Sequence, residues 1–137
     1  MKITITTQVA ATPERVWEAY TNPEDVKRWN FASPEWHCPA ATADLRVGGA
    51  FSWRMEAKDG SFGFDFAGTY TKLEPHSRIE YAFGDRTAQV SFEEGPAGVT
   101  VSVTFDAEEE NSADMQRAGW QAILDNFRTH VEAARAA

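Results

Sequence analysis

The segment spanning residues 44–70 alternates apolar and polar side chains in two runs, and this period-two pattern is typical of paired β-strands. The large apolar residues of the two runs are Phe51, Trp53, Met55, Phe62, Phe64 and Phe66. Asp59-Gly60 stands between the runs and predicts a hairpin with a two-residue type I′ turn, whose central residues both need positive φ. In that register Trp53 lies opposite Phe66. Met55 likewise lies opposite Phe64, so one face of the hairpin is aromatic.

The same register brings two charged residues together on the other face of the hairpin. Arg54 lies opposite Asp65, and the neighbours of both in sequence belong to the aromatic face. We therefore expect the pair to point to solvent, where such an ion pair contributes about 0–1 kcal/mol. Turned inward, the pair would instead be able to bind a ligand's carboxylate or hydroxyl.

Composition limits the class of protein and its compartment. The 137 residues are 42% hydrophobic and 12% aromatic, which favours one folded domain over residues 1–137. Cys38 is the single cysteine and cannot form an intrachain disulfide, so a reducing compartment is expected. No apolar run reaches the ~20 residues of a membrane span, and the amino terminus alternates like a strand rather than a signal peptide. These features predict a cytoplasmic protein that does not bind membranes.

The charge and the motifs of the chain limit which molecules it can bind. The net charge of −8 disfavours nucleic acid, because binding to phosphates needs clustered Lys and Arg. Metal binding is not predicted, since His37, His76 and His130 show no ligand spacing and His37 merely adjoins Cys38. No phosphate-binding loop or dinucleotide motif is present, so no cofactor is expected. The sequence does not specify an oligomeric state and is compatible with a homodimer.

The order of elements is a strand, two short helices, six strands and a long helix. Thr12-Pro13 and Asn22-Pro23 each combine a capping side chain with a proline at the first helical position, and so each predicts a helix start. Residues 31–39 are expected to be a loop. The predicted strands cover residues 2–10, 43–47, 50–58, 61–73, 78–84, 87–94 and 98–106.

The long helix is expected to begin after Asn111 or Ser112 and to end near Ala134. Its apolar residues recur at helical spacing and include Trp120, Leu124, Phe127 and Val131. At 1.5 Å per residue the helix is roughly 33 Å long, which is enough to cover the apolar face of an antiparallel sheet. The small residues Ala118, Gly119 and Ala122 either let the sheet approach closely or leave space. The expected fold class is α+β, with a seven-stranded antiparallel sheet curved around this helix.

This arrangement resembles the helix-grip fold of the START-like superfamily (also called SRPBCC), and within it the bacterial relatives of the C-terminal domain of the Hsp90 ATPase activator, AHSA1. The motifs that carry the resemblance are Ala11-Thr12-Pro13-Glu14-Arg15-Val16-Trp17, Asn22-Pro23-Glu24, Arg28-Trp29, Asp44-Leu45-Arg46-Val47-Gly48-Gly49, Asp59-Gly60, Gly68-Thr69-Tyr70 and Gly119-Trp120. The resemblance spans essentially the whole chain. It implies a small hydrophobic ligand held between the long helix and the sheet.

The leading functional expectation is therefore non-enzymatic binding of a small hydrophobic molecule, aromatic or lipid-like, in that space. The ligand-binding residues predicted are Trp29, Phe31, Trp36, Trp53, Met55, Phe64, Phe66, Tyr81, Trp120 and Phe127. For each ring taken singly, an ordinary place in the core is the competing interpretation.

Two alternatives stay open. The first is an enzyme of the cyclase or hydrolase kind in the same space, for which Glu56, Asp65, Tyr81 and His37 could supply acid–base groups if one of them faced the cavity with a shifted pKa. No residue is assigned as catalytic. The second is a chaperone-activating interaction module, which the resemblance implies. An Hsp90-type partner is the less favoured of these, because the eukaryotic founder of the family uses an additional amino-terminal domain for chaperone binding.

Overall fold

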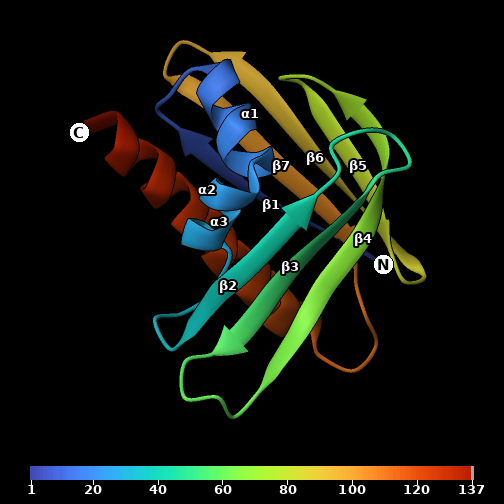
Figure 1. Cartoon of the computed structure of the whole chain (residues 1–137). Helices are drawn as coiled ribbons and strands as arrows, with labels where there is room; N and C mark the ends of the chain where they lie inside the picture. Colours follow the sequence, from blue (N-terminus) through green and yellow to red (C-terminus); the bar gives the residue numbers. More distant parts are fainter. Residues whose placement is uncertain (137) are drawn as a thin grey trace.

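The computed structural model describes residues 1–136, with side-chain surroundings described through residue 133. The described residues form one sheet of seven antiparallel strands and three helices (Figure 1). Their bounds are Lys2–Val9 (β1), Pro13–Thr21 (α1), Pro23–Trp29 (α2), Trp36–Ala43 (β2), Ala50–Ala57 (β3), Gly63–Glu74 (β4), Arg78–Phe83 (β5), Arg86–Gly95 (β6), Gly98–Asp106 (β7) and Ala113–Ala136 (α3). The sheet curls around α3, as the sequence predicts, and α1 and α2 follow the first strand.

All three helices begin at the caps that the sequence indicates. The Thr12 hydroxyl accepts a hydrogen bond from the Arg15 backbone N–H at 3.2 Å. Asn22 Oδ1 accepts one from the Glu24 N–H at 3.0 Å, and the Ser112 hydroxyl accepts one from the Met115 N–H at 3.1 Å. Each cap pairs a backbone donor that the helix itself leaves unpaired.

The order of strands in the sheet is β1-β7-β6-β5-β4-β3-β2. The register predicted for the aromatic hairpin is confirmed, because Trp53 pairs with Phe66 and Met55 pairs with Phe64. Phe51 pairs with Gly68, and its ring lies where a side chain on Gly68 would stand. A Cβ at position 68 would stand 2.9 Å from this ring and 2.4 Å from the Ala82 carbonyl oxygen, so the close approach of the ring requires glycine there.

The predicted turn type of this hairpin is wrong. A type I′ turn needs two residues with positive φ, but of Asp59 and Gly60 only Gly60 has one, at 78°. The loop instead covers residues 58–61 and is closed by a hydrogen bond from the Ala57 N–H to the Phe62 carbonyl at 2.9 Å. Asp59 keeps ordinary φ while its carboxylate accepts from the Ser61 N–H at 2.8 Å. The loop is symmetric about Asp59-Gly60, so the register is the same as for the predicted turn.

The strand predicted at residues 43–47 is also wrong, and so is the last part of the loop predicted at 31–39, because residues 36–39 belong to a strand. The second strand is Trp36–Ala43, and it pairs with β3 at the edge of the sheet. Its pairing is interrupted between His37 and Ala40, around Pro39. A proline cannot donate to a neighbouring strand and is tolerated at such an interruption on an edge. Residues 44–48 form a turn in which the Arg46 N–H donates to the Asp44 carbonyl at 2.8 Å.

Side chains of α3 bond to the open edge of β1. Arg117 Nη1 donates to the Thr4 carbonyl at 2.7 Å, and Gln121 Nε2 donates to the Thr6 carbonyl at 3.2 Å. Both carbonyls lie on the side of β1 that faces away from β7. The long helix therefore contacts the edge of the sheet as well as its concave face.

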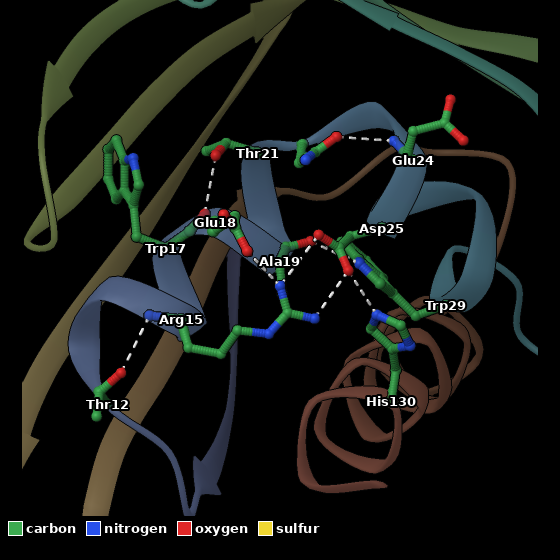
Figure 2. Close-up of polar contacts among 11 residues, drawn as sticks. Thr12, Arg15, Trp17, Glu18, Ala19, Thr21, Glu24, Asp25, Trp29 and His130 are labelled. Atoms are coloured by element: carbon green, nitrogen blue, oxygen red, sulfur yellow. Dashed lines mark hydrogen bonds and ion pairs between the residues drawn. The ribbon is translucent and has the colours of Figure 1, made fainter. Parts of the chain in front are cut away.

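An ionic cluster joins the three helices where α1 and α2 meet α3 (Figure 2). Asp25 accepts a hydrogen bond from Arg15 Nη2 at 2.9 Å, and His130 Nε2 lies 2.8 Å from the same carboxylate oxygen. Arg15 also pairs with Glu18 at 2.6 Å. Burial opposes ionisation of Asp25, but the bonds from Arg15 and His130 outweigh it and lower the pKa of Asp25. The cluster fixes the packing of the short helices on α3.

Replacing Gly119 with alanine is expected to raise the free energy of unfolding by about 0.5–1 kcal/mol, as measured by urea denaturation. A Cβ built at Gly119 meets no atom within 4 Å, so alanine fits at this position without a clash. The gain comes from the lower flexibility of alanine in the unfolded chain. Ala118→Gly, at an exposed neighbouring position, should lower stability by a similar amount. A loss of stability in Gly119→Ala would show that the position is tightly packed.

Candidate functional site

A cavity of about 340 Å³ lies between α3 and the concave face of the sheet. Its volume falls within the range of about 300–1,000 Å³ that is typical of small-molecule sites. The residues that line it are Ile5, Tyr20, Trp29, Asn30, Phe51, Trp53, Met55, Phe64, Phe66, Tyr70, Ile79, Tyr81, Arg86, Val103, Glu108, Asn111, Gln116, Trp120, Ile123 and Leu124. The lining is therefore largely apolar, with a few polar groups.

Most of the residues predicted from the sequence to contact a ligand line this cavity. They are Trp29, Trp53, Met55, Phe64, Phe66, Tyr81 and Trp120. Phe66 lies at the centre of an aromatic group, with ring centroids 6.3 Å from Tyr81 and 6.0 Å from Trp120. Trp120 in turn stacks on Phe105 of β7, with centroids 3.9 Å apart and planes 8° apart. The rings of the cavity wall are thus held by further rings in the core.

Three predicted residues lie outside the lining. Phe127 is completely buried, with 0% of its surface exposed, and packs against Tyr20 and Trp29 at centroid distances of 5.2 and 5.0 Å. It belongs to the core because its helix face turns toward α1 and α2. Phe31 follows α2, where its carbonyl accepts a hydrogen bond from Asn126 Nδ2 at 2.6 Å.

Trp36 is the third residue outside the lining, and it packs beside the cavity. Its ring lies 5.9 Å from Phe62 and 6.2 Å from Phe64. Phe64 lines the cavity and is 39% exposed, and Phe62 is 61% exposed. These three rings form an aromatic rim at the tip of the β3–β4 hairpin, next to the more exposed part of the lining.

Sequence reasoning missed the polar part of the lining, above all Tyr20, Asn30, Tyr70 and Arg86. Tyr70 could have been found, because it continues the alternation of Phe64 and Phe66 along β4. Asn30 carried no such signal, since it stands where α2 ends and belongs to no periodic run.

The three tyrosines of the lining are hydrogen-bond donors at neutral pH. Burial raises the pKa of Tyr70 to about 12, and burial likewise raises the pKa of Tyr20 and of Tyr81. The phenols of Tyr20 and Tyr70 also raise the pKa of their neighbours: Tyr70 acts on Tyr20, and both act on Tyr81. Groups with such pKa values keep their protons at pH 7, so they donate hydrogen bonds and do not act as bases.

Gln116 shapes the part of the cavity that is formed by the segment between β7 and α3. Its Oε1 accepts a hydrogen bond from the Glu108 N–H at 2.8 Å. Its Nε2 donates to the Glu108 carbonyl at 3.1 Å and to the Asn111 carbonyl at 2.8 Å. The buried amide of Gln116 therefore fixes the backbone that carries Glu108 and Asn111 into the lining.

The carboxylates considered for catalysis lie on the other face of the sheet. Arg54 pairs with Glu56 at 2.8 Å and with Asp65 at 3.6 Å, which confirms the predicted pair across the hairpin. His37 lies 3.6 Å from Glu56 on the same face. Of the acid–base candidates, only Tyr81 lines the cavity.

Cys38 is buried, and burial raises the pKa of its thiol. Within the described part of the chain, no group of three or more His, Cys, Asp or Glu side chains is arranged to hold a metal ion. None of the described helices is both long and apolar enough to cross a membrane.

Two solved structures share both the fold and substantial sequence identity with the chain. An AHSA1-like protein from Aeromonas hydrophila is 46% identical, with a TM-score of 0.93, and the match covers 100% of this chain and 96% of that one. A protein from Cytophaga hutchinsonii is 41% identical, with a TM-score of 0.83 and coverage of 98% and 94%. A protein from Nitrosomonas europaea, 19% identical with a TM-score of 0.83 and coverage of 100% and 97%, shares the fold.

No curated protein matches the chain at a significant level. The model of one family does match, over residues 10–132, and this family is described as Activator of Hsp90 ATPase homolog 1-like protein. The matched region begins just after β1 and runs into the last turns of α3, and so includes every element that contributes to the cavity except β1. The chain therefore belongs to the Activator of Hsp90 ATPase homolog 1-like family, which has the START-like fold.

Proposed function

We propose that this protein binds a small, uncharged, ring-bearing molecule in the cavity between α3 and the sheet, without catalysing its conversion. The observation that carries the proposal is the cavity of about 340 Å³, whose wall is largely aromatic. Rings bind well to such walls through offset and edge-to-face contacts, which are worth about 0.5–1.5 kcal/mol each beyond the area they bury. Family membership supports a helix-grip module of this kind.

Replacing Ile123 with tryptophan is expected to weaken binding of N-phenyl-1-naphthylamine, a neutral fluorescent probe, by at least about tenfold. Ile123 lines the cavity from α3, so a larger ring at this position occupies the space of the ligand. The change in probe fluorescence on titration with protein measures the affinity. Thr129→Trp adds the same ring to an exposed position of the same helix and should leave binding unchanged.

Two results would contradict the proposal. One is that the wild-type protein does not enhance the fluorescence of the probe at all. The other is that Ile123→Trp, with a normal unfolding temperature, binds the probe as tightly as the wild-type protein does. The unfolding temperature separates a blocked cavity from a misfolded chain.

An enzyme of the cyclase or hydrolase kind is the less supported alternative. Glu56 and Asp65 pair with Arg54 on the face of the sheet away from the cavity. Tyr81 does line the cavity, but its raised pKa makes it a donor rather than a base at pH 7. Loss of turnover in Tyr81→Phe, with ligand binding retained, would favour this alternative.

The family match supports a second candidate, an activator-like interaction with an Hsp90-type chaperone. Stimulation of the ATPase activity of a purified chaperone by the purified chain tests it, and no stimulation at high excess would dispose of it. We further propose that the chain acts as one domain in the cytoplasm, in keeping with its single cysteine.

A further inference from the structure

We propose that the cavity selects a ring-bearing ligand with a neutral acceptor oxygen, such as a ketone, and that the hydroxyls of Tyr70 and Tyr81 donate to that oxygen. This inference rests on the proposed binding function and names the polar group that the ligand carries. It starts from phenols that line the cavity without a partner in the protein.

Tyr70 and Tyr81 lie directly opposite each other on neighbouring strands. They form a pair in the β4–β5 register and are only 4% and 7% exposed. Residues paired in this way have Cβ atoms about 4.5–5.5 Å apart on the same face of the sheet, so the two side chains line the cavity side by side. The ring of Phe51 lies 5.1 Å from each of them. Both phenols are therefore held in the wall by the sheet and by a neighbouring ring.

The two hydroxyls have no partner in the protein. Among the residues that the structure describes, none bonds to the phenol oxygen of Tyr70 or Tyr81, and the two hydroxyls do not bond to each other. Neither oxygen is fully enclosed, so a molecule the size of water can reach both. Buried polar side chains are nearly always bonded. An almost fully buried phenol that lines a cavity without a bond therefore points to a partner inside that cavity.

Tyr20 brings a third hydroxyl from α1 to the same part of the cavity. It is half-buried and lines the cavity, and none of the described residues bonds to its hydroxyl. The phenol of Tyr70 raises the pKa of Tyr20, and both raise the pKa of Tyr81, so the three hydroxyls lie near one another. Because all three stay protonated at pH 7, this part of the wall offers several O–H donors.

A neutral acceptor complements these hydroxyls better than a hydrocarbon or an anion does. A carbonyl oxygen has two lone pairs and can accept from two O–H groups at once. A hydrocarbon would displace water from the hydroxyls and leave them unbonded, which is costly. Within the lining, the charged side chains are Arg86 and Glu108, which have opposite signs. A buried carboxylate would therefore lose its water without gaining a positively charged wall.

The positions along β4 set the orientation of the ligand. Phe64, Phe66 and Tyr70 all line the cavity from this strand, and Phe64 belongs to the aromatic rim. Six residues of a strand span roughly 20 Å, so the phenols and the rim stand at opposite ends of this wall. We therefore expect the oxygen of the ligand to point toward Tyr70 and its rings to lie against Phe66.

Three naphthalene derivatives of similar shape test this inference by isothermal titration calorimetry. They are 2-acetonaphthone, which is a ketone, 2-isopropylnaphthalene, which has no polar atom, and 2-naphthoate, which is an anion. We expect the wild-type protein to bind the ketone about tenfold more tightly than either of the others. The preference for the ketone over the hydrocarbon should fall in Tyr70→Phe and in Tyr81→Phe. It should disappear in the double variant, because each substitution removes one donor and keeps the ring.

The carbonyl stretching band of the bound ketone reports the hydrogen bond directly. Hydrogen bonding lowers the frequency of this band, and the difference between unlabelled and carbonyl-¹³C-labelled ketone isolates it from the bands of the protein. At saturation we expect a lower frequency in the wild-type protein than in the double variant. The same frequency in both proteins would overturn the inference.

Thermal unfolding without ligand separates hydroxyls that wait for a ligand from structural ones. The phenol hydroxyls bond to no described residue, so Tyr70→Phe and Tyr81→Phe should not lower the unfolding temperature. Thr21→Val is the matched control, because Thr21 is also buried but its hydroxyl donates to the Trp17 carbonyl at 2.8 Å. This control should unfold at a lower temperature. An equal fall in the two phenylalanine variants would show that the phenols have partners within the protein, and would overturn the assignment.

The remaining outcomes separate this inference from the proposed function. If none of the three compounds binds, the proposed binding function fails and the inference fails with it. If the hydrocarbon or the anion binds as tightly as the ketone, binding in the cavity stands but the inference is wrong. If the preference for the ketone survives in the double variant, the assignment of Tyr70 and Tyr81 as its donors is overturned.

Discussion

Replacing Phe127 with alanine is expected to lower the free energy of unfolding by about 3–5 kcal/mol, the range for large aromatic residues removed from cores. Phe127 is completely buried and makes edge-to-face contacts with Tyr20 and Trp29, so the change leaves a hole where the three helices meet. Denaturation in urea, followed by tryptophan fluorescence, measures the effect. A loss this large removes much of the stability of an ordinary domain.

The control for this prediction is Phe62→Ala. Phe62 is 61% exposed in the aromatic rim, and its removal should change stability by no more than about 0.5 kcal/mol. If Phe127→Ala proved equally mild, Phe127 would not be a core residue. In that case the affinity of Phe127→Ala for a ligand should be measured, because replacing a residue of the cavity wall would reduce ligand affinity more than it reduces stability.

Replacing Asp25 with asparagine is expected to lower the free energy of unfolding by about 1–3 kcal/mol at pH 7. The variant keeps the shape of the side chain, but it leaves Arg15 and His130 without the carboxylate that bonds to both. Asp85→Asn, at an exposed turn position, is the matched control and should be close to neutral. An equal effect of the two substitutions would mean that the ionic cluster does not hold the helices together.

The contribution of the Asp25 carboxylate to the free energy of unfolding should depend on pH, and the direction of its pKa shift fixes the direction of that dependence. Its pKa in the folded protein is lowered from the ordinary value of 3.8, so the folded state favours the charged form. The resulting stability is fully present above pH 3.8 and is lost as the pH falls toward the folded-state pKa. The difference between wild type and Asp25→Asn should therefore shrink as the pH falls below about 4. A difference that grows as the pH falls below about 4 would contradict this linkage.

Local patterns predict most of this fold because they act through short stretches of chain. Thr12, Asn22 and Ser112 each cap a helix with a side chain that bonds two or three residues ahead. The β3–β4 register follows from alternation, because a shift by one residue would turn every aromatic side chain of the hairpin to the other face. The caps and the alternation all favour the same fold, so few other arrangements of the chain compete with it.

The wrong predictions of the second strand and of the hairpin turn fall where a tertiary or side-chain contact determines the path of the backbone. The second strand exists because β3 offers it an edge to pair with, although Pro39 and the interrupted pairing hide any alternation. The turn at Asp59-Gly60 depends on which hydrogen bond the Asp59 carboxylate makes, which composition does not fix. In both places the local sequence permits more than one backbone path.

The aromatic part of the candidate site on the strands was predictable, whereas the part formed where helices end or meet was not. Trp53, Phe64 and Phe66 follow from alternation, whereas Phe127 shares the helical spacing of Trp120 but faces a different neighbour. Asn30 belongs to the wall because α2 ends there and the chain turns beneath α3. No periodic signal describes such a junction.

The bonds from Arg117 and Gln121 to the Thr4 and Thr6 carbonyls also restrict how this protein can assemble. Many complexes and fibrils form by adding a foreign strand to an open sheet edge. On the β1 side an incoming strand would have to displace two side-chain bonds that come from α3, the helix that also lines the cavity. Strand addition at this edge would therefore cost the contacts through which α3 holds β1, and so the long helix also guards the edge of the sheet.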